Sequence, residues 1–349
     1  MTFTAPTGHR YTTQPAGAAL FPALSVPTGA LNVSARAGPP VGNQDRSGTT
    51  AAGEAERCGP AAAALKSTTG CGARVWHDSE LMLSSTGLGK ALMPVPDPHP
   101  DVFDRQWPLR PADVDRLSRL RMDAAVRHIQ DIGQDHLREM GHNDTHPLWI
   151  VRRTMLDMIR PIEFQDMLRL RRWCSGASNR WCEMRVRIDG RKGGLVETEA
   201  FWINFNRETQ GPARIADDFM GSLLKTTDVD RLRWKSYLSP GSRANADEIR
   251  EFPIRVSDID LFDHVNNSVY WKVVEEFLAP HPELLEAPLR VTIEHDAAIA
   301  YGEKLEILLH TYPPGSTDKF GAELTDRTVR TLTYVVGDAV KALAAIFPL

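Results

Sequence analysis

The ten residues 258–267 bring together groups that can do acid–base chemistry. They read DIDLFDHVNN and stand directly before NSVYWKVVEEFL, an apolar run with helical spacing. Asp260 could act as a general base or a nucleophile, and His264 could orient a water molecule, relay a proton or hold Asp260. If a helix starts near Asn267, its free N–H groups form a positive dipole end, and Asn266 and Asn267 could cap it. This pattern favours a catalytic corner at the start of a helix.

Two further carboxylates lie in the same stretch. Asp258 precedes Asp260 by two positions, and Asp263 precedes His264. We interpret Asp258 as a solvated charge at the end of a strand and Asp263 as a turn residue. Neither is assigned a role in chemistry.

The elements around this corner predict a strand, a helix and a meander that occur twice. In the first half, the apolar spacing predicts one helix over about 118–140, and alternating residues predict strands over 148–159, 167–174, 180–188 and 195–206. In the second half, strand 251–257 precedes the corner and its helix, and strands follow over 289–296, 304–310, 327–336 and 339–347. Gly337-Asp338 fits a two-residue hairpin turn. One helix with an antiparallel meander indicates an α+β unit.

The motif DxDxxxHVNNxxYxxxxEE resembles the signature of hotdog thioesterases, in which an antiparallel sheet wraps one long helix. The duplicated layout is similar to the acyl-acyl-carrier-protein thioesterase family over about residues 100–349. HIQDIGQDHLREMG and FWINFNRETQGPARI resemble first-half segments of that family. The resemblance implies an α+β tandem hotdog with two antiparallel sheets, each wrapping a long helix. Its parts would be a disordered segment 1–98, a first hotdog domain 99–245 and a second one, 246–349, that carries the active site.

The resemblance also implies an activity. The chain would be a thioesterase of fatty acid biosynthesis that hydrolyses acyl-acyl-carrier-protein, or acyl-CoA, to free fatty acid. Asp260 and His264 match the catalytic positions of the family, while Asn266 and Asn267 would support the corner. The helix N–H groups could stabilise an oxyanion. Acyl carrier protein or acyl-CoA is the expected substrate, no cofactor is expected, and a homodimer is left open.

The chain departs from the family at two positions. Phe262 stands where plant-type members carry Asn, and Ala298 stands where they carry Glu. Neither side chain can hydrogen-bond or titrate. Three alternatives follow: Asp260 and His264 suffice, a nearby acid such as Glu294 or Asp296 substitutes, or the protein is a weak or inactive acyl-binding hotdog protein.

Composition excludes several other classes of function. The chain has 349 residues, of which 25% are charged, and a formal net charge of -4, which argues against non-specific nucleic-acid binding. No stretch of 18 apolar residues occurs, so we expect no transmembrane helix and a cytoplasmic protein. The four Cys residues, Cys58, Cys71, Cys174 and Cys182, complete no zinc pattern, so no metal is expected.

The N-terminal segment differs in composition from the rest. Residues 1–98 are rich in Ala, Gly, Pro, Ser and Thr and show no sustained apolar period. Such a segment buries too little surface to offset its ordering entropy, which predicts disorder. An organelle transit peptide and a translation start near Met82 or Met93 are the alternatives.

Overall fold

The computed structural model describes residues 2–4, 10–12, 87–96 and 99–349, without 207, 210, 286–287, 317–319, 321–323 and 325. The chain divides into two units, 1–68 and 69–349. In the first unit, β1 (Thr2–Thr4) pairs antiparallel with β2 (Arg10–Thr12). Everything that follows concerns the second unit.

Helices and strands of the second unit fall into two series. The first consists of β3 (Phe103–Pro108), α2 (Met122–Glu139), β4 (Trp149–Arg160), β5 (Met167–Ser178), β6 (Trp181–Gly190), β7 (Leu195–Asn206), β8 (Gly211–Pro212) and α3 (Asp217–Leu223). The second consists of β9 (Glu248–Phe252), α4 (Val269–Leu278), α5 (Pro282–Leu285), β10 (Leu289–His295), β11 (Leu305–Tyr312), β12 (Val329–Val336) and β13 (Ala339–Pro348). Strand, helix and meander thus occur twice, as predicted.

The strands form one continuous antiparallel sheet in the order β3-β5-β6-β7-β4-β10-β13-β12-β11-β9, with β8 beside β7. The α+β tandem layout is confirmed, but the two predicted sheets are joined. The inner edges of the two halves, β4 and β10, pair antiparallel from Leu289↔Met158 to Glu294↔Arg153. Pairing these edges satisfies backbone groups that two separate sheets would leave open.

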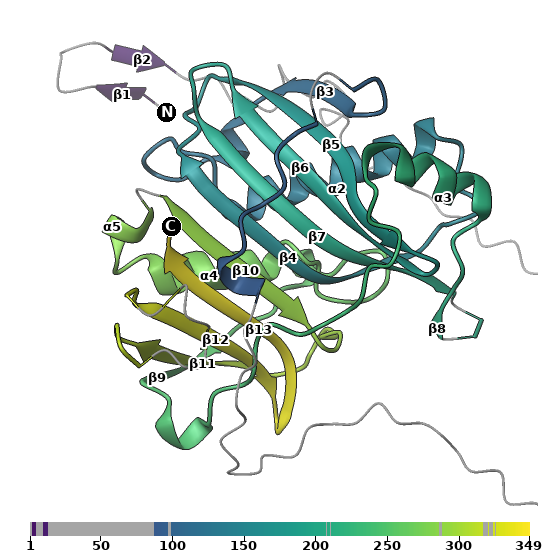
Figure 1. Ribbon diagram of the computed structural model, residues 1–349. Helices are drawn as coiled ribbons and strands as arrows, with labels where there is room; N and C mark the ends of the chain where they lie inside the picture. Colours follow the sequence, from purple (N-terminus) through teal and green to yellow (C-terminus); the bar gives the residue numbers. More distant parts are fainter. Residues whose placement is uncertain are drawn as a thin grey trace, which may run out of the picture. The chain divides into compact units, whose positions relative to one another are not determined.

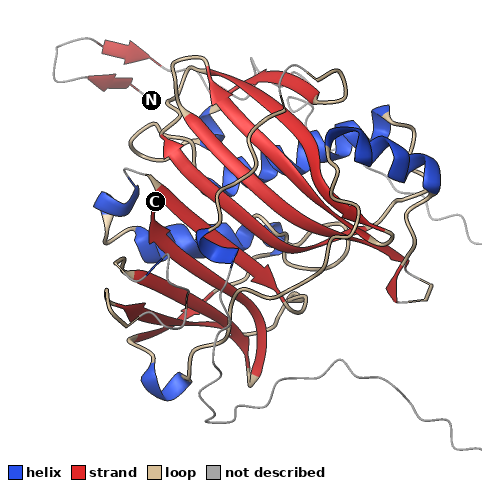
Figure 2. Cartoon of the chain, viewed as in Figure 1, coloured by secondary structure: helices blue, strands red, loops and turns tan. Residues whose placement is uncertain are grey.

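Both long helices lie against the same face of the sheet (Figures 1 and 2). A single apolar core joins α2 residues such as Ile129 and Ile132, α4 residues such as Trp271 and Val274, and strand residues of both halves. On α4, Val269, Val273, Val274, Phe277 and Leu278 are buried, as their helical spacing predicted. No helix in the described part of the chain is long and apolar enough to cross a membrane.

Residues 87–96 contradict the prediction that the whole of 1–98 is disordered. Leu88 is fully buried against Leu238 and Phe347 in a second apolar cluster. The Arg290 side chain donates to the backbone oxygens of Leu88 (2.7 Å) and Lys90 (2.6 Å). These contacts order a segment whose composition alone gave no sign of packing.

One predicted helix and one predicted strand have different boundaries in the structure. The first helix was expected from about 118, but α2 starts at Met122, because residues 113–121 form a tight corner before it. The strand expected over 251–257 ends at Phe252, directly before Pro253, which cannot donate to the sheet. Val256–Asp258 form a 3-10 turn instead.

Candidate active site

The predicted catalytic corner is a closed loop between the 3-10 turn Val256–Asp258 and α4. A bridge between Ile259 and Val265 closes it, and the Asp260 N–H donates to the His264 carbonyl oxygen at 2.8 Å. Asp263 has a φ of 60°, the left-handed region, at the tip of the turn. Asp263 is thus a turn residue, as interpreted from the sequence.

Asp260 holds this loop through one carboxylate oxygen. Its Oδ1 accepts the N–H of Phe262 at 2.8 Å and that of His264 at 3.4 Å. Within the described part of the chain, Oδ2 has no hydrogen-bonding partner, and neither has the exposed His264 ring. The carboxylate is therefore fixed in place and still has one oxygen for a ligand.

Asn266 and Asn267 differ in their hydrogen bonds. Asn266 Oδ1 accepts the Ser268 N–H at 2.9 Å, which fixes the turn that leads into the helix. α4 begins at Val269 rather than near Asn267, with Ser268 as its N-cap. No described residue accepts the backbone N–H of Asn267. Asn267 itself lines the pocket at this corner, just ahead of the helix.

A pocket of about 660 Å³ opens at this corner. The corner contributes Asp260, Phe262, His264 and Asn267 to its lining. Both halves of the sheet supply the rest: Leu148, Trp149, Ile150, Val151, Arg152 and Phe205 from the first, and Tyr270, His295, Asp296, Ala297 and Ala298 among those from the second. An apolar wall beside a carboxylate and an open N–H suits an uncharged substrate with a reactive carbonyl.

Asp258 lies inside the structure, contrary to our interpretation of it as a solvated charge. Its side chain is 2% exposed, pairs with Lys272 at 3.0 Å, and accepts the Arg255 N–H at 3.0 Å. A buried carboxylate needs such partners. Its role is to fix the 3-10 turn against α4.

Of the two possible substitute acids, only Asp296 reaches the pocket. It is ion-paired there with Arg152 at 3.2 Å. Glu294 is buried elsewhere, paired with Arg153 at 3.3 Å and accepting hydrogen bonds from Ser236 and Tyr237. Because β10 alternates its faces, Glu294 points away from the side that carries the corner, so the prediction that it substitutes is wrong.

Phe262 and Ala298, the two residues that sequence analysis set against the family pattern, both lie at the pocket. Phe262 is half-buried and Ala298 exposed, and both line the cavity that holds Asp260. The family models for the acyl-ACP thioesterase N-terminal domain and C-terminal domain match residues 100–223 and 241–347. The chain belongs to the acyl-ACP thioesterase family. Its members are thioester hydrolases.

The chain is similar to a protein of known sequence and to two solved structures. An uncharacterized protein of Mycobacterium tuberculosis is 39% identical over 245 residues, covering 70% of this chain and 91% of its own length. A putative oleoyl thioesterase from Lactobacillus plantarum has a TM-score of 0.59 at 17% identity, covering 70% of this chain and 94% of its own. A 12:0-ACP thioesterase from Umbellularia californica has a TM-score of 0.55 at 19% identity, covering 72% and 99%. These two likenesses show a shared fold.

The first half of the chain contains a second copy of the corner, which sequence analysis missed. The hydrogen bonds of the second corner recur 145 positions earlier in the chain. Asp115 corresponds to Asp260, and Arg119 corresponds to His264. The Asp115 N–H donates to the Arg119 carbonyl oxygen at 2.8 Å, and Asp115 Oδ1 accepts the N–H groups of Leu117 and Arg119, both at 2.8 Å. Ser118 has a φ of 62° at the position of Asp263. We call residues 113–123 the first corner and residues 258–268 the second corner.

In the first corner, both reactive positions are occupied by other protein groups. Asp115 Oδ2 accepts hydrogen bonds from Arg119 Nε at 3.0 Å and Nη2 at 2.9 Å. The Met122 N–H, which corresponds to that of Asn267, donates to Glu275 Oε1 at 2.6 Å. Burial raises the pKa of Glu275 to about 8. A pocket of about 540 Å³ adjoins this corner, but its carboxylate and its N–H are already bonded within the protein.

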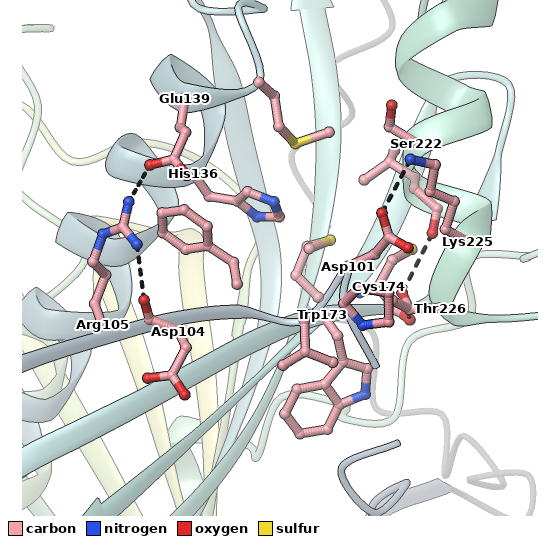
Figure 3. A pocket seen from close by; sticks show the side chains of 16 residues that line it. Asp101, Asp104, Arg105, His136, Glu139, Trp173, Cys174, Ser222, Lys225 and Thr226 are labelled. Carbon is pink, nitrogen blue, oxygen red and sulfur yellow. Dashed lines mark hydrogen bonds and ion pairs between the residues drawn. The ribbon is translucent and has the colours of Figure 1, made fainter. Parts of the chain in front are cut away.

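A third pocket, of about 400 Å³, lies in the first half between β3, the end of α2 and β5 (Figure 3). Ion pairs at its rim join Asp101 to Lys225 at 3.0 Å and Arg105 to Glu139. Neither corner contributes to its lining. The combination of a carboxylate, an imidazole and an open backbone N–H is found at the second corner.

Proposed function

We propose that the protein hydrolyses acyl-acyl-carrier-protein thioesters to free fatty acid at the second corner. The observation that carries the proposal is that one pocket is lined by Asp260, with its open Oδ2, and by Asn267, whose backbone N–H no described residue accepts. The release of fatty acid from its carrier is a step of fatty acid biosynthesis. Acyl-CoA is the other substrate that this chemistry admits.

In the proposed reaction, Asp260 acts as the base. It takes a proton from a water molecule, and the water oxygen attacks the thioester carbonyl carbon. The Asn267 N–H stabilises the oxygen that becomes negative, and a well-placed donor of this kind contributes about 3–4 kcal/mol. When the C–S bond breaks, the thiolate takes the proton back from Asp260. His264, exposed at the pocket edge, is proposed to orient the water or relay the proton.

Asp296 is not proposed as a base in this reaction. Its pairing with the positive charge of Arg152 makes it a weaker base than a carboxylate without such a partner. The two pocket residues instead form a fixed charged wall beside the substrate. Asp260 and His264 therefore carry the proposed chemistry, with Asn266 holding the helix entry in place.

Phe262 and Ala298 support a second candidate, an acyl-binding protein without turnover. The decisive experiment offers a panel of acyl-acyl-carrier-protein and acyl-CoA thioesters of several chain lengths to the purified protein. We expect thiol release by the wild type and a loss of about 100-fold or more in Asp260→Asn. Tight acyl binding with no thiol release on any substrate supports the second candidate and contradicts the first.

A further inference from the structure

The loop that follows β10 forms an apolar edge beside the second corner. Residues 297–301 read AAIAY, and four of these five residues are exposed. The Tyr301 side chain is 64% exposed, and Leu261, on the second corner itself, is 85% exposed. A backbone bridge between His264 and Ala300 holds the loop against the corner. The exposed apolar residues of the loop and the corner, which we call the apolar rim, are Leu261, Ala297, Ala298, Ala300 and Tyr301.

Part of the apolar rim lies at the opening of the second-corner pocket. Leu261, Ala297 and Ala298 line the pocket and are also exposed to solvent, so they stand where the pocket opens. Ala300 and Tyr301 follow in the same loop and do not line the pocket. Exposed apolar side chains that gather around one opening, in contrast to scattered ones, mark a site of interaction.

The first corner has charged side chains at three of the corresponding positions. The Ile162 carbonyl oxygen accepts the Leu120 N–H at 2.8 Å in the first corner. The Ile299 carbonyl oxygen accepts the Val265 N–H at 2.8 Å in the second, so the loop after β4 matches the loop after β10 at a spacing of 137 positions. The exposed residues that correspond, first corner before second, are Arg116 and Leu261, Arg160 and Ala297, and Glu163 and Ala300.

This difference shows that the fold does not impose an apolar surface here. Both corners share their backbone hydrogen bonds, yet charged side chains keep the first one solvated. The apolar residues occur at the corner whose carboxylate has an open oxygen and whose pocket is the proposed site of reaction. The apolar rim therefore belongs with the reaction, as a surface for something that arrives with the substrate.

The carrier of the acyl group is what arrives at this opening. In the proposed reaction the acyl chain reaches Asp260 while its thioester still joins it to the carrier, so the carrier comes to lie against the apolar rim. Coenzyme A would bring phosphate groups, for which the rim residues offer no positive charge. A protein carrier can bring apolar side chains, and burying them against Leu261 and Tyr301 stabilises the complex.

We propose that the apolar rim is the docking surface for the protein carrier of the acyl group, and that it makes the enzyme select carrier-protein thioesters over coenzyme A thioesters. This inference rests on the proposed thioesterase function. The rim binds the carrier and takes no part in breaking the thioester. Its loss therefore raises KM for the carrier-protein substrate and leaves kcat unchanged. A small thioester with the same acyl group has no carrier to dock, so its hydrolysis is unaffected.

The test uses Tyr301→Ser, because Tyr301 belongs to the apolar rim but does not line the pocket. The two substrates are an acyl-acyl-carrier-protein and the N-acetylcysteamine thioester of the same acyl group. We expect KM for the carrier-protein substrate to rise about 10-fold, with kcat unchanged and both constants for the small thioester at wild-type values. Leu117→Ser, at a 49% exposed apolar residue of the first corner, is the matched control and should equal the wild type.

A second variant, Ala300→Glu, gives the apolar rim the residue that the first corner carries at Glu163, and it should also raise KM for the carrier-protein substrate alone. An equal rise for both substrates, or no rise for either, overturns the inference. So does a wild-type dimer that Tyr301→Ser turns into a monomer in analytical ultracentrifugation, because a second copy of the chain then covers the rim.

The failure of the proposed function is distinguishable from the failure of this inference. A wild type that releases no thiol from either substrate overturns the proposed function. Calorimetric binding of the acyl-acyl-carrier-protein then tests the apolar rim without turnover. About 10-fold weaker binding by Tyr301→Ser supports the docking surface, and equal binding overturns it.

Discussion

The first and second corners share the same backbone hydrogen bonds. They differ in whether the Asp carboxylate and the backbone N–H are already bonded within the protein. In both, a bridge closes the loop, a residue with φ near 60° turns it, and an Asp accepts two N–H groups of its own loop. The first corner fills its remaining positions with Arg119 and Glu275, whereas the second leaves Asp260 and the Asn267 N–H open. The comparison shows that the fold supplies the corner and that a few side chains decide whether it can react.

The largest effect should come from moving the arginine of the first corner into the second. In His264→Arg the new guanidinium can pair with Asp260 as Arg119 pairs with Asp115. A carboxylate held this way is a poorer base, so we expect turnover to fall by about 100-fold or more. Steady-state hydrolysis of an acyl thioester measures this, with Arg119→His as the matched control. Near-wild-type turnover in His264→Arg would show that the arginine is not what separates the corners.

Glu275 should make the contribution of the first corner to stability depend on pH. Its folded-state pKa of about 8 lies above the unfolded value, so the folded protein holds the proton more tightly. The free energy of unfolding should therefore fall as pH rises from about 4.5 to 8, by an amount on the order of a few kcal/mol. Glu275→Gln should remove this fall.

Chemical denaturation at pH 5 and pH 8.5 measures the effect. Glu276→Gln is the control, because Glu276 lines the same pocket but is exposed. An unchanged pH dependence in Glu275→Gln contradicts the assignment of a half-buried carboxyl with a raised pKa to this position.

A smaller effect is expected from removing the arginine of the first corner. The Arg119 and Asp115 side chains are 14% and 26% exposed, so their pair is partly screened by water. Arg119→Ala should lower the free energy of unfolding by about 1 kcal/mol. Turnover should equal that of the wild type, because this corner takes no part in the reaction. A combined thermal melt and hydrolysis assay checks both, and a loss of turnover in the folded variant counts against the division of roles.

Local patterns predicted most of the fold. The alternation in 148–159 and 339–347 and the helical spacing of 269–278 correspond to β4, β13 and α4 within a few residues. The joining of the two halves through β4 and β10 could not be predicted, because backbone pairing leaves no signature in either strand's side chains. The ordering of Leu88 depends on a tertiary contact that the composition of its segment does not show.

The sequence predicted the residues at the centre of the candidate site but not the residues that surround them. The motif placed Asp260, His264 and Asn267 together, and the structure finds all three in one pocket. Of the two suggested acids, Asp296 lies in the pocket and Glu294 does not, since a strand's faces cannot be assigned before its register is known. The first corner had a signal in the sequence, the ADVDRLSRL segment at 112–120, which matches SDIDLFDHV at 257–265 in its two Asp residues and its apolar positions.

The central claim is that only the open corner reacts, and one paired measurement tests it most directly. Asp260→Asn and Asp115→Asn make the same chemical change in the same backbone setting, 145 positions apart. Initial rates of acyl-acyl-carrier-protein hydrolysis should fall by about 100-fold or more in Asp260→Asn and stay at the wild-type level in Asp115→Asn. Equal rates in the two variants, whether both high or both low, would contradict the account.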